Sequence, residues 1–344
     1  MKTKIILSII TVFTLVGLTV FFNSASESTS KIQVIDYFKG DPVGVFELAA
    51  DDPSKGITQS KLAASKIGLT FTNAQAKTTA RSVSFLDDKG KDATRHFEYD
   101  ADKGYLSFNK GVSQQILSTT SKLPDAKSAE NIANKFLSDN FLLPANKSEL
   151  KVEHVGGIKR MSSKDQKEYD VMKTVYYSRT IEGVPVVGEG SRVIVEIGNN
   201  GEVMAVTKKW KEVKPSTRTK NKIAASELKS QAEAEAEFKQ IVASQFGSGA
   251  SSKIQTISKT YFDGGEDFIQ PIYLMASSVR FKSEDGQVIE RDYVQPVSML
   301  KKAPEGLMGS LSDLQKAKGE SEIKTLTDQQ KDNPPASNAP KRQK

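Results

Sequence analysis

The chemistry open to this chain of 344 residues is limited, because it contains only two histidines and no cysteine. His96 lies in the segment TRHFEYD and His154 in KVEHVGG, and both segments are typical of β-strands. There is no HExxH motif, so a zinc site would need both of these distant histidines together with carboxylates. We interpret the two histidines as strand side chains and expect no metal site.

Nucleophilic and cofactor chemistry have little support in the sequence. A Ser–His–Asp triad would need one of the same histidines. Neither Ser191 in GEGSR nor Ser248 in GSGASS has the strand-turn-helix setting of a nucleophile elbow. Gly188 and Gly190 lack the third glycine and the following helix of a dinucleotide-binding fingerprint. We therefore expect no catalytic residue and no cofactor.

Paired carboxylates are the remaining route to catalysis. Asp263, Glu266 and Asp267 in FDGGEDF could supply a general acid and a general base. The segment DADKG, Asp100 to Gly104, resembles the start of a calcium loop but lacks the later glutamate ligand. Acidic residues are common in glycine-containing turns, so we interpret both segments as turns. A secreted hydrolase that uses a carboxylate pair stays open as an alternative function.

The charge pattern argues against a nucleic-acid partner. The formal net charge is +7, but Lys and Arg are spread along the chain with Asp and Glu between them. A nucleic-acid-binding protein would cluster its basic residues on one element, with aromatic residues among them. A slightly basic surface is compatible with attraction to anionic polymers of a cell envelope, so a structural envelope protein is a second alternative.

The two ends of the chain differ from its middle. Lys2 and Lys4 precede an uncharged apolar stretch from Ile5 to Phe22, which predicts that the following residues lie outside the cytoplasm. The stretch is intermediate in length between a signal-peptide core and a membrane span, so it predicts either an anchor or a signal peptide cleaved near Ser26. From about Pro304 the chain is polar and proline-containing, which predicts a flexible tail.

Strand patterns alternate with two helical patterns between these ends. In PDAKSAENIANKFLSDNFLLP, Asp125 or Ser128 can cap a helix that ends by Pro144. Its predicted apolar stripe consists of Ala129, Ile132, Ala133, Phe136 and Leu137. A second helix is predicted over about 226–245, with Ser226 as its cap and Leu228, Phe238, Ile241 and Val242 as its buried face. TQSKLAASKIGL is compatible with a short helix or a loop.

Strands are expected on both sides of each helix. Residues 80–110 predict a three-stranded meander, and Asn200–Gly201 and Asp285–Gly286 predict hairpin turns. The single tryptophan, Trp210, ends an alternating strand and is expected to anchor a core. This order predicts an α+β fold in which antiparallel sheets are each packed by a helix.

One stretch resembles a known family. It reads VMKTVYYSRTIEGVPVVGEGSRVIVEIGNNGEVMAVTKKWKEV and is similar to the PepSY and fungalysin/thermolysin-type propeptide (FTP) modules of exported proteins. AENIANKFLSDNFLLP resembles the helix that precedes the sheet in such modules. The similarity extends from Asp125 to Val297 and is strongest from Tyr176 to Trp210. It implies two PepSY-like units that act without catalysis outside the cytoplasm, with no protease domain in this chain.

The expected organisation has five parts: residues 1–30, a signal peptide or anchor with a stem; 31–122, a β-rich region; 123–215, a PepSY-like α+β domain; 216–300, a second helix-plus-sheet unit; and 301–344, a flexible tail. The expected function is that of an exported cell-envelope protein that binds and regulates or chaperones another protein, such as a protease or a sensor. A free sheet edge could take up an extended peptide of that partner by strand addition.

Overall fold

The computed structural model describes residues 31–72, 74–87, 95–111, 122–161, 168–218 and 222–307. Within these residues, one mixed sheet contains 15 strands. They are β1 (Gln33–Asp36), β2 (Phe46–Ala49), β3 (Lys77–Thr78), β4 (Ser82–Leu86), β5 (His96–Asp100), β6 (Tyr105–Asn109), β7 (Leu150–Met161), β8 (Glu168–Ile181), β9 (Val184–Val187), β10 (Arg192–Ile197), β11 (Val203–Lys209), β12 (Glu212–Val213), β13 (Ser251–Asp263), β14 (Phe268–Lys282) and β15 (Val288–Ser298).

The described residues contain fewer helices than strands. The helices are α1 (Pro53–Lys66), α3 (Ala126–Asp139), α4 (Pro215–Arg218) and α5 (Gln231–Phe246), with short 3-10 turns η1 (Lys147–Glu149), η2 (Asn199–Gly201) and η3 (Ala225–Glu227). No helix in this part of the chain is long and apolar enough to span a membrane. The predicted segment Ile5–Phe22, the cleavage position near Ser26 and the tail beyond residue 307 lie outside the described residues.

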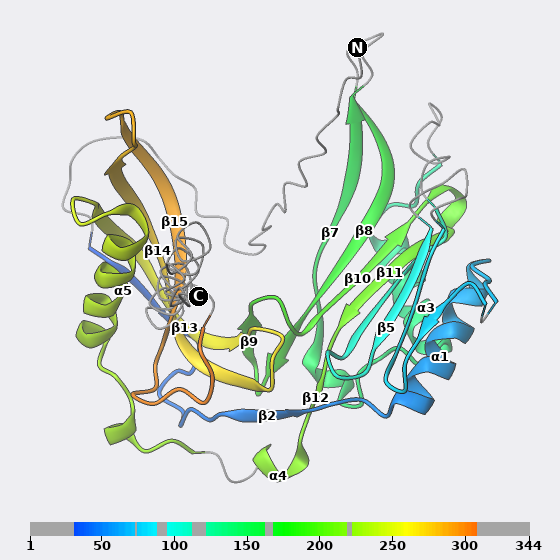
Figure 1. Cartoon of the computed structure of the whole chain (residues 1–344), viewed down its shortest axis with the longest axis horizontal. Coiled ribbons are helices and arrows are strands. Elements are labelled where there is room, and N and C mark those ends of the chain that lie inside the picture. The colour runs from blue at the N-terminus through cyan, green and yellow to red at the C-terminus, as the bar shows by residue number, and fades with distance from the viewer. Residues whose placement is uncertain are drawn as a thin grey trace, which may run out of the picture.

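The sheet has two halves, which lie side by side with their helices on the outer sides (Figure 1). We call them the α1/α3 half, with β3–β8, β10 and β11, and the α5 half, with β1, β2 and β12–β15. Strand β9 joins them, because it pairs antiparallel with β8 and parallel with β13. β9 and β10 lie on the same edge of β8, because β8 pairs with β10 along residues 173–178 and with β9 along residues 179–181. β7 lies on the opposite edge of β8.

Each half has its own apolar core. In the α1/α3 half, helices α1 and α3 pack on strands that bury Phe97, Phe108, Val175 and Val195 completely. In the α5 half, Phe238 and Ile241 of α5 pack against the strands β13–β15. The predicted role of Trp210 is confirmed, because its side chain is 1% exposed and belongs to the first core.

Helix α3 forms as its sequence predicts. Asp125 caps it by accepting a hydrogen bond from the backbone N–H of Ser128. Ala129, Ala133 and Leu137 follow at intervals of four residues and are fully buried, which holds the helix against the sheet. The helix ends at Asp139 rather than continuing to Pro144.

The structure decides one open helical prediction and contradicts another. The helix alternative for TQSKLAASKIGL is confirmed from Thr58 to Lys66, which belong to the 14-residue helix α1 that starts at Pro53 after the cap Asp52. The prediction that Ser226 caps the second long helix is wrong, because Ser226 lies in η3. α5 begins at Gln231, where Ser230 and Glu233 form a capping box that satisfies the free N–H groups of the first turn.

The hairpin predictions are confirmed where the structure describes them. Asn200 and Gly201 have φ angles of +57° and +76° in the connection between β10 and β11. β4, β5 and β6 form the predicted meander. The segment from Gly183 to Gly188 contains strand β9, and the chain reverses at Glu182–Gly183, where both φ angles are positive. Thr180 of β8 faces Pro185 of β9.

The predicted fold class, α+β with two PepSY-like units of helix-packed antiparallel sheet, is wrong. The protein is mostly β, and its strands form one mixed sheet rather than separate sheets. The cause is the pairing of β9, which forms a tight hairpin with β8, with the distant strand β13 on its other side. The strands β7, β8 and β13–β15 are also long, with 11 to 15 residues each.

Candidate functional site

A buried arginine lies where the two halves meet. Alternation along β8 turns Val175, Tyr177 and Arg179 to the same buried side, and Arg179 is 0% exposed. Its guanidinium carbon lies 3.8 Å from the centre of the Trp210 ring. Arg179 Nη2 donates a hydrogen bond of 2.8 Å to the carbonyl oxygen of Lys211. The cation is thus stacked on the ring of Trp210, the residue that follows β11.

Two buried carboxylates balance this charge. Glu149 Oε2 lies 3.1 Å from Arg179 Nε, an ion pair without the alignment of a hydrogen bond. Asp263 Oδ2 lies 4.0 Å from Arg179 Nη1. Burial lowers the pKa of Arg179 below its usual value, and the charges of Glu149 and Asp263 only partly oppose this effect. Because an arginine pKa starts above 12, the guanidinium stays charged at neutral pH.

Ser191 links the arginine to the α5 half. Arg179 Nη1 donates to Ser191 Oγ at 2.9 Å, and Ser191 Oγ in turn donates to Asp263 Oδ2. Gly190 allows this approach, because a Cβ atom there would lie 2.0 Å from Asp263 Oδ1. The glycine of GEGSR therefore serves close packing of one half of the sheet against the other.

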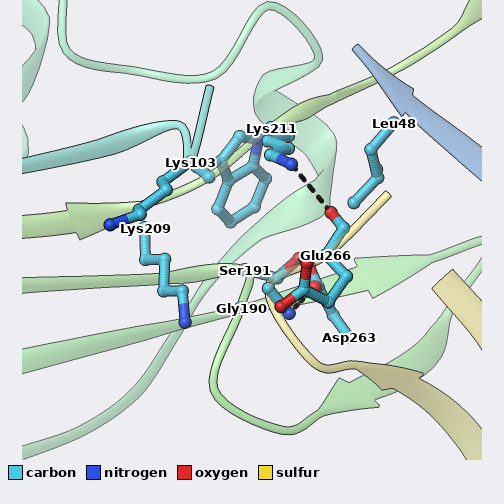
Figure 2. Close-up of a pocket in the computed structure, with 10 residues that line it drawn as sticks. Leu48, Lys103, Gly190, Ser191, Lys209, Lys211, Asp263 and Glu266 are labelled. Carbon is cyan, nitrogen blue, oxygen red and sulfur yellow. Dashed lines mark hydrogen bonds between the residues drawn. The ribbon is translucent and has the colours of Figure 1, made fainter. Parts of the chain in front are cut away.

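Lys211, next to Trp210, extends this network to the residues between β13 and β14. Lys211 Nζ donates to the carbonyl oxygen of Glu266 and to Asp267 Oδ1, both at 3.0 Å. Figure 2 shows Lys211 and Glu266 near Ser191 and Asp263. The hollow beside Ser191 and Asp263 has a volume of about 0 Å³ for a water molecule. We interpret the network as a structural junction, because its buried polar groups bind one another.

The carboxylates considered in the sequence do not converge on a cleft. Asp263 is 1% exposed and accepts bonds from Ser191 and from the backbone N–H of Gly265. The side chain of Asp267 is 73% exposed and pairs with Lys211. Asp100 lies in the turn between β5 and β6, where it accepts bonds from the N–H groups of Asp102 and Lys103. That segment is a hairpin turn, as predicted.

The two histidines lie on separate strands, as predicted. His96 Nε2 lies 2.9 Å from Ser107 Oγ of the neighbouring strand β6. His154 of β7 stacks on Tyr176 of β8 with ring centres 4.2 Å apart. Burial lowers the pKa of His154, which favours its neutral form. Among the residues that the structure describes, no group of three or more metal-ligating side chains comes together.

An open pocket of about 340 Å³ lies at the start of β7. Its lining comes from η1 and the residue before it, from β7, from the end of β8 with its turn, and from α4. The lining residues are Asn146, Ser148, Glu149, Lys151, Thr180, Glu182, Gly183 and Arg218. Arg218 pairs with Glu149 Oε1, which also accepts a bond from Asn146 Nδ2.

Strand β7 itself is a free edge of the sheet. It pairs with β8 and with no other strand of the described residues. Ile158 is 39% exposed and Met161 is 63% exposed. The backbone groups of β7 that point away from β8 are therefore available to a further strand.

The sequence gives one usable signal for the junction and none for the pocket. Arg179 stands at a position where strand alternation demands an apolar residue, between Tyr177 and Ile181, which indicates a buried charge that needs partners. Lys151, Thr180 and Arg218 have no pattern that links them, because they lie on three separate elements, β7, β8 and α4.

Comparisons with known proteins return little for this chain. No family model matches it. No curated protein matches it either. Among solved structures, it is similar to an uncharacterised protein from Eubacterium rectale, with a TM-score of 0.44 and 9% sequence identity over 77% of this chain and 86% of that one.

Proposed function

We propose that this protein is an exported, non-catalytic binding protein that captures an extended segment of a partner polypeptide by adding it to the free edge of β7. The observation that carries the proposal is this edge: 12 residues long, paired on one side only within the described chain, with two exposed apolar side chains. Strand addition of this kind obtains affinity from backbone hydrogen bonds and specificity from alternate side chains. The apolar, uncharged stretch after Lys4 supports export.

β7 differs from the other free edges of the described sheet. β1, β3 and β12 are only two to four residues long and offer few backbone groups. β15 is long, but Glu290, Arg291 and Asp292 form a run of exposed charges along it and Pro296 lies near its end. The exposed charges of β7, Lys151, Glu153 and Lys159, by contrast leave the segment from His154 to Ile158 without charged residues. Charges and proline are the usual protection of an edge against strand addition.

The middle of β7 is suited to close backbone approach. Register shifts occur between Val152 and His154 and between Ile158 and Lys159, and the segment from His154 to Ile158 pairs regularly between them. This segment contains Gly156 and Gly157. A Cβ atom at Gly156 would meet nothing closer than 3.4 Å, so packing does not require glycine there. A glycine without a packing reason in a strand often marks a place where another backbone approaches.

Peptide binding by variants of the edge tests this proposal. The probe is a pool of octapeptides with Val, Ile or Thr at alternate positions and Gln or Ser between them, labelled with fluorescein at the amino terminus. We expect the anisotropy titration to show binding to the wild type, and the double change Ile158→Lys and Met161→Lys to weaken it at least about tenfold, because lysines protect an edge.

The control is Leu62→Lys on α1, which removes a comparably exposed apolar side chain at 51% exposure but lies away from the edge. It should leave binding within about twofold of the wild type, since it changes surface charge only and not the strand edge. The proposal fails if the wild type does not bind the pool, or if Leu62→Lys weakens binding as much as the β7 variant does.

A further inference from the structure

The pocket at the start of β7 lies where one end of a segment bound along β7 would lie. It opens beside Lys151, the second residue of β7, and its volume of about 340 Å³ is at the lower end of the range for small-ligand sites. A strand that adds antiparallel to β7 runs toward Leu150, so its carboxyl end arrives at this pocket. From this arrangement we infer that the pocket binds the C-terminal carboxylate of the partner segment. The inference rests on the proposed function.

Three side chains of the pocket can donate hydrogen bonds to a carboxylate. Lys151 has no ion-pair or hydrogen-bond partner within the described part of the chain, and the same holds for the hydroxyl of Thr180. Arg218 uses one Nη group to contact Glu149, which leaves its other N–H groups for a ligand. Two cations and a hydroxyl that line the same pocket match the charge-assisted bonds that a carboxylate accepts.

Two carboxylates also line the pocket. Glu149 is 3% exposed and already lies between Arg179 and Arg218, so its charge is engaged by these arginines. Lys151 and Arg218 share the lining with Glu149 and with one further carboxylate. The second carboxylate, Glu182, has no partner among the described residues.

Glu182 also has an unusual backbone conformation. Its φ angle is +53°, in a turn where Gly183 follows at +82°. Asn, Asp and Gly are the usual residues at such a position, and a larger side chain there is strained. The charge of Glu182 at the pocket repels a peptide carboxylate and attracts a peptide amine. Removing this charge should therefore have opposite effects on the binding of the two kinds of peptide end.

The experiment compares two forms of the octapeptide pool that differ only in a free C-terminal carboxylate or a C-terminal amide. With the wild type, we expect the carboxylate form to bind about tenfold more tightly, as charge-assisted hydrogen bonds predict. Lys151→Gln should reduce this preference to about threefold or less. Glu182→Gln should increase it, because a repelling charge is removed. Both variants should bind the amide form as the wild type does.

The outcomes separate this inference from the proposed function. If both forms bind equally, and the change Ile158→Lys with Met161→Lys weakens both, strand addition stands and the carboxylate site is refuted. If neither form binds the wild type, the proposed function itself fails. If Glu182→Gln weakens binding of a pool with a free amino terminus and leaves the carboxylate preference unchanged, the pocket binds the amine of a parallel strand and the inference is overturned.

Discussion

The guanidinium of Arg179 stacks on Trp210 at 3.8 Å, and this pair lies where strands of the two halves of the sheet meet. From there Arg179 contacts Glu149 before β7 and reaches Asp263 at the end of β13 through Ser191. Residues more than 100 positions apart in the chain therefore share one buried network. Arg179 itself pairs with Val186 of β9, so the network lies at the place where β9 joins the two halves.

Replacing Arg179 by methionine should lower the free energy of unfolding by about 3–5 kcal/mol, because Glu149 and Asp263 would remain buried without the cation between them. Urea unfolding at pH 7 measures this change. Trp210 is the only tryptophan and its fluorescence reports the junction. The control is Arg81→Met, which removes an exposed pair with Asp102 and should cost less than about 1 kcal/mol. Equal losses in the two variants would contradict a special role for the junction.

A methyl group at Gly190 should also destabilise the protein. The Cβ atom of Gly190→Ala would lie 2.0 Å from Asp263 Oδ1, and Asp263 cannot move away without losing its bonds to Ser191 and Gly265. We expect a loss of about 1–3 kcal/mol, as for overpacking in other cores. Gly249→Ala is the matched control: nothing lies within 4 Å of its added Cβ. The midpoint temperatures of thermal unfolding of the two variants test this prediction. An unchanged midpoint for Gly190→Ala would show that the junction has room for the added methyl group.

Local features of this fold could be predicted from the sequence, and long-range pairing could not. Asp125 and the four-residue spacing of Ala129, Ala133 and Leu137 define α3 without reference to the rest of the chain. Asn200 and Gly201 likewise define their own turn through positive φ angles. Such signals depend on neighbours within a few residues, so the sequence contains them completely.

The sequence does not predict the fold class, because the single mixed sheet depends on the pairing of β9 with both β8 and β13. Val184 to Val187 is short, contains a proline and is adjacent to glycine, so it suggests a turn when read alone. Its strand character comes from β8 on one side and from β13, some 75 residues later, on the other. The same limit applies to the pocket, because Lys151 and Arg218 are far apart in the chain and line it together only in the folded protein.

Glu196 should make stability depend on pH. It lies on β10 between Thr174 and Ala205, and burial raises the pKa of its carboxyl. The folded state therefore holds this proton more tightly than the unfolded state does, and stability falls as pH rises from about 4.3, the unfolded value, through the raised folded pKa. Glu196→Gln removes this loss, so it should be more stable than the wild type at pH 7–8, with the difference shrinking below pH 4. Chemical unfolding from pH 3 to 8 tests this, and a difference independent of pH would refute it.

Phe141 occupies a position after α3 that favours glycine. Leu142 N–H donates to the carbonyl of Leu137 and Phe141 N–H to that of Ser138, the pattern of a Schellman motif, and Phe141 has φ +56°. Its side chain is 70% exposed, so little packing offsets the strain. Phe141→Gly should raise the free energy of unfolding by about 0.5–1 kcal/mol, since the relief of the left-handed conformation exceeds the added chain entropy. Phe141→Ala keeps a Cβ atom and should change stability by less than about 0.5 kcal/mol. Equal stabilisation by alanine and glycine would show instead that the exposed aromatic ring is the source of the cost.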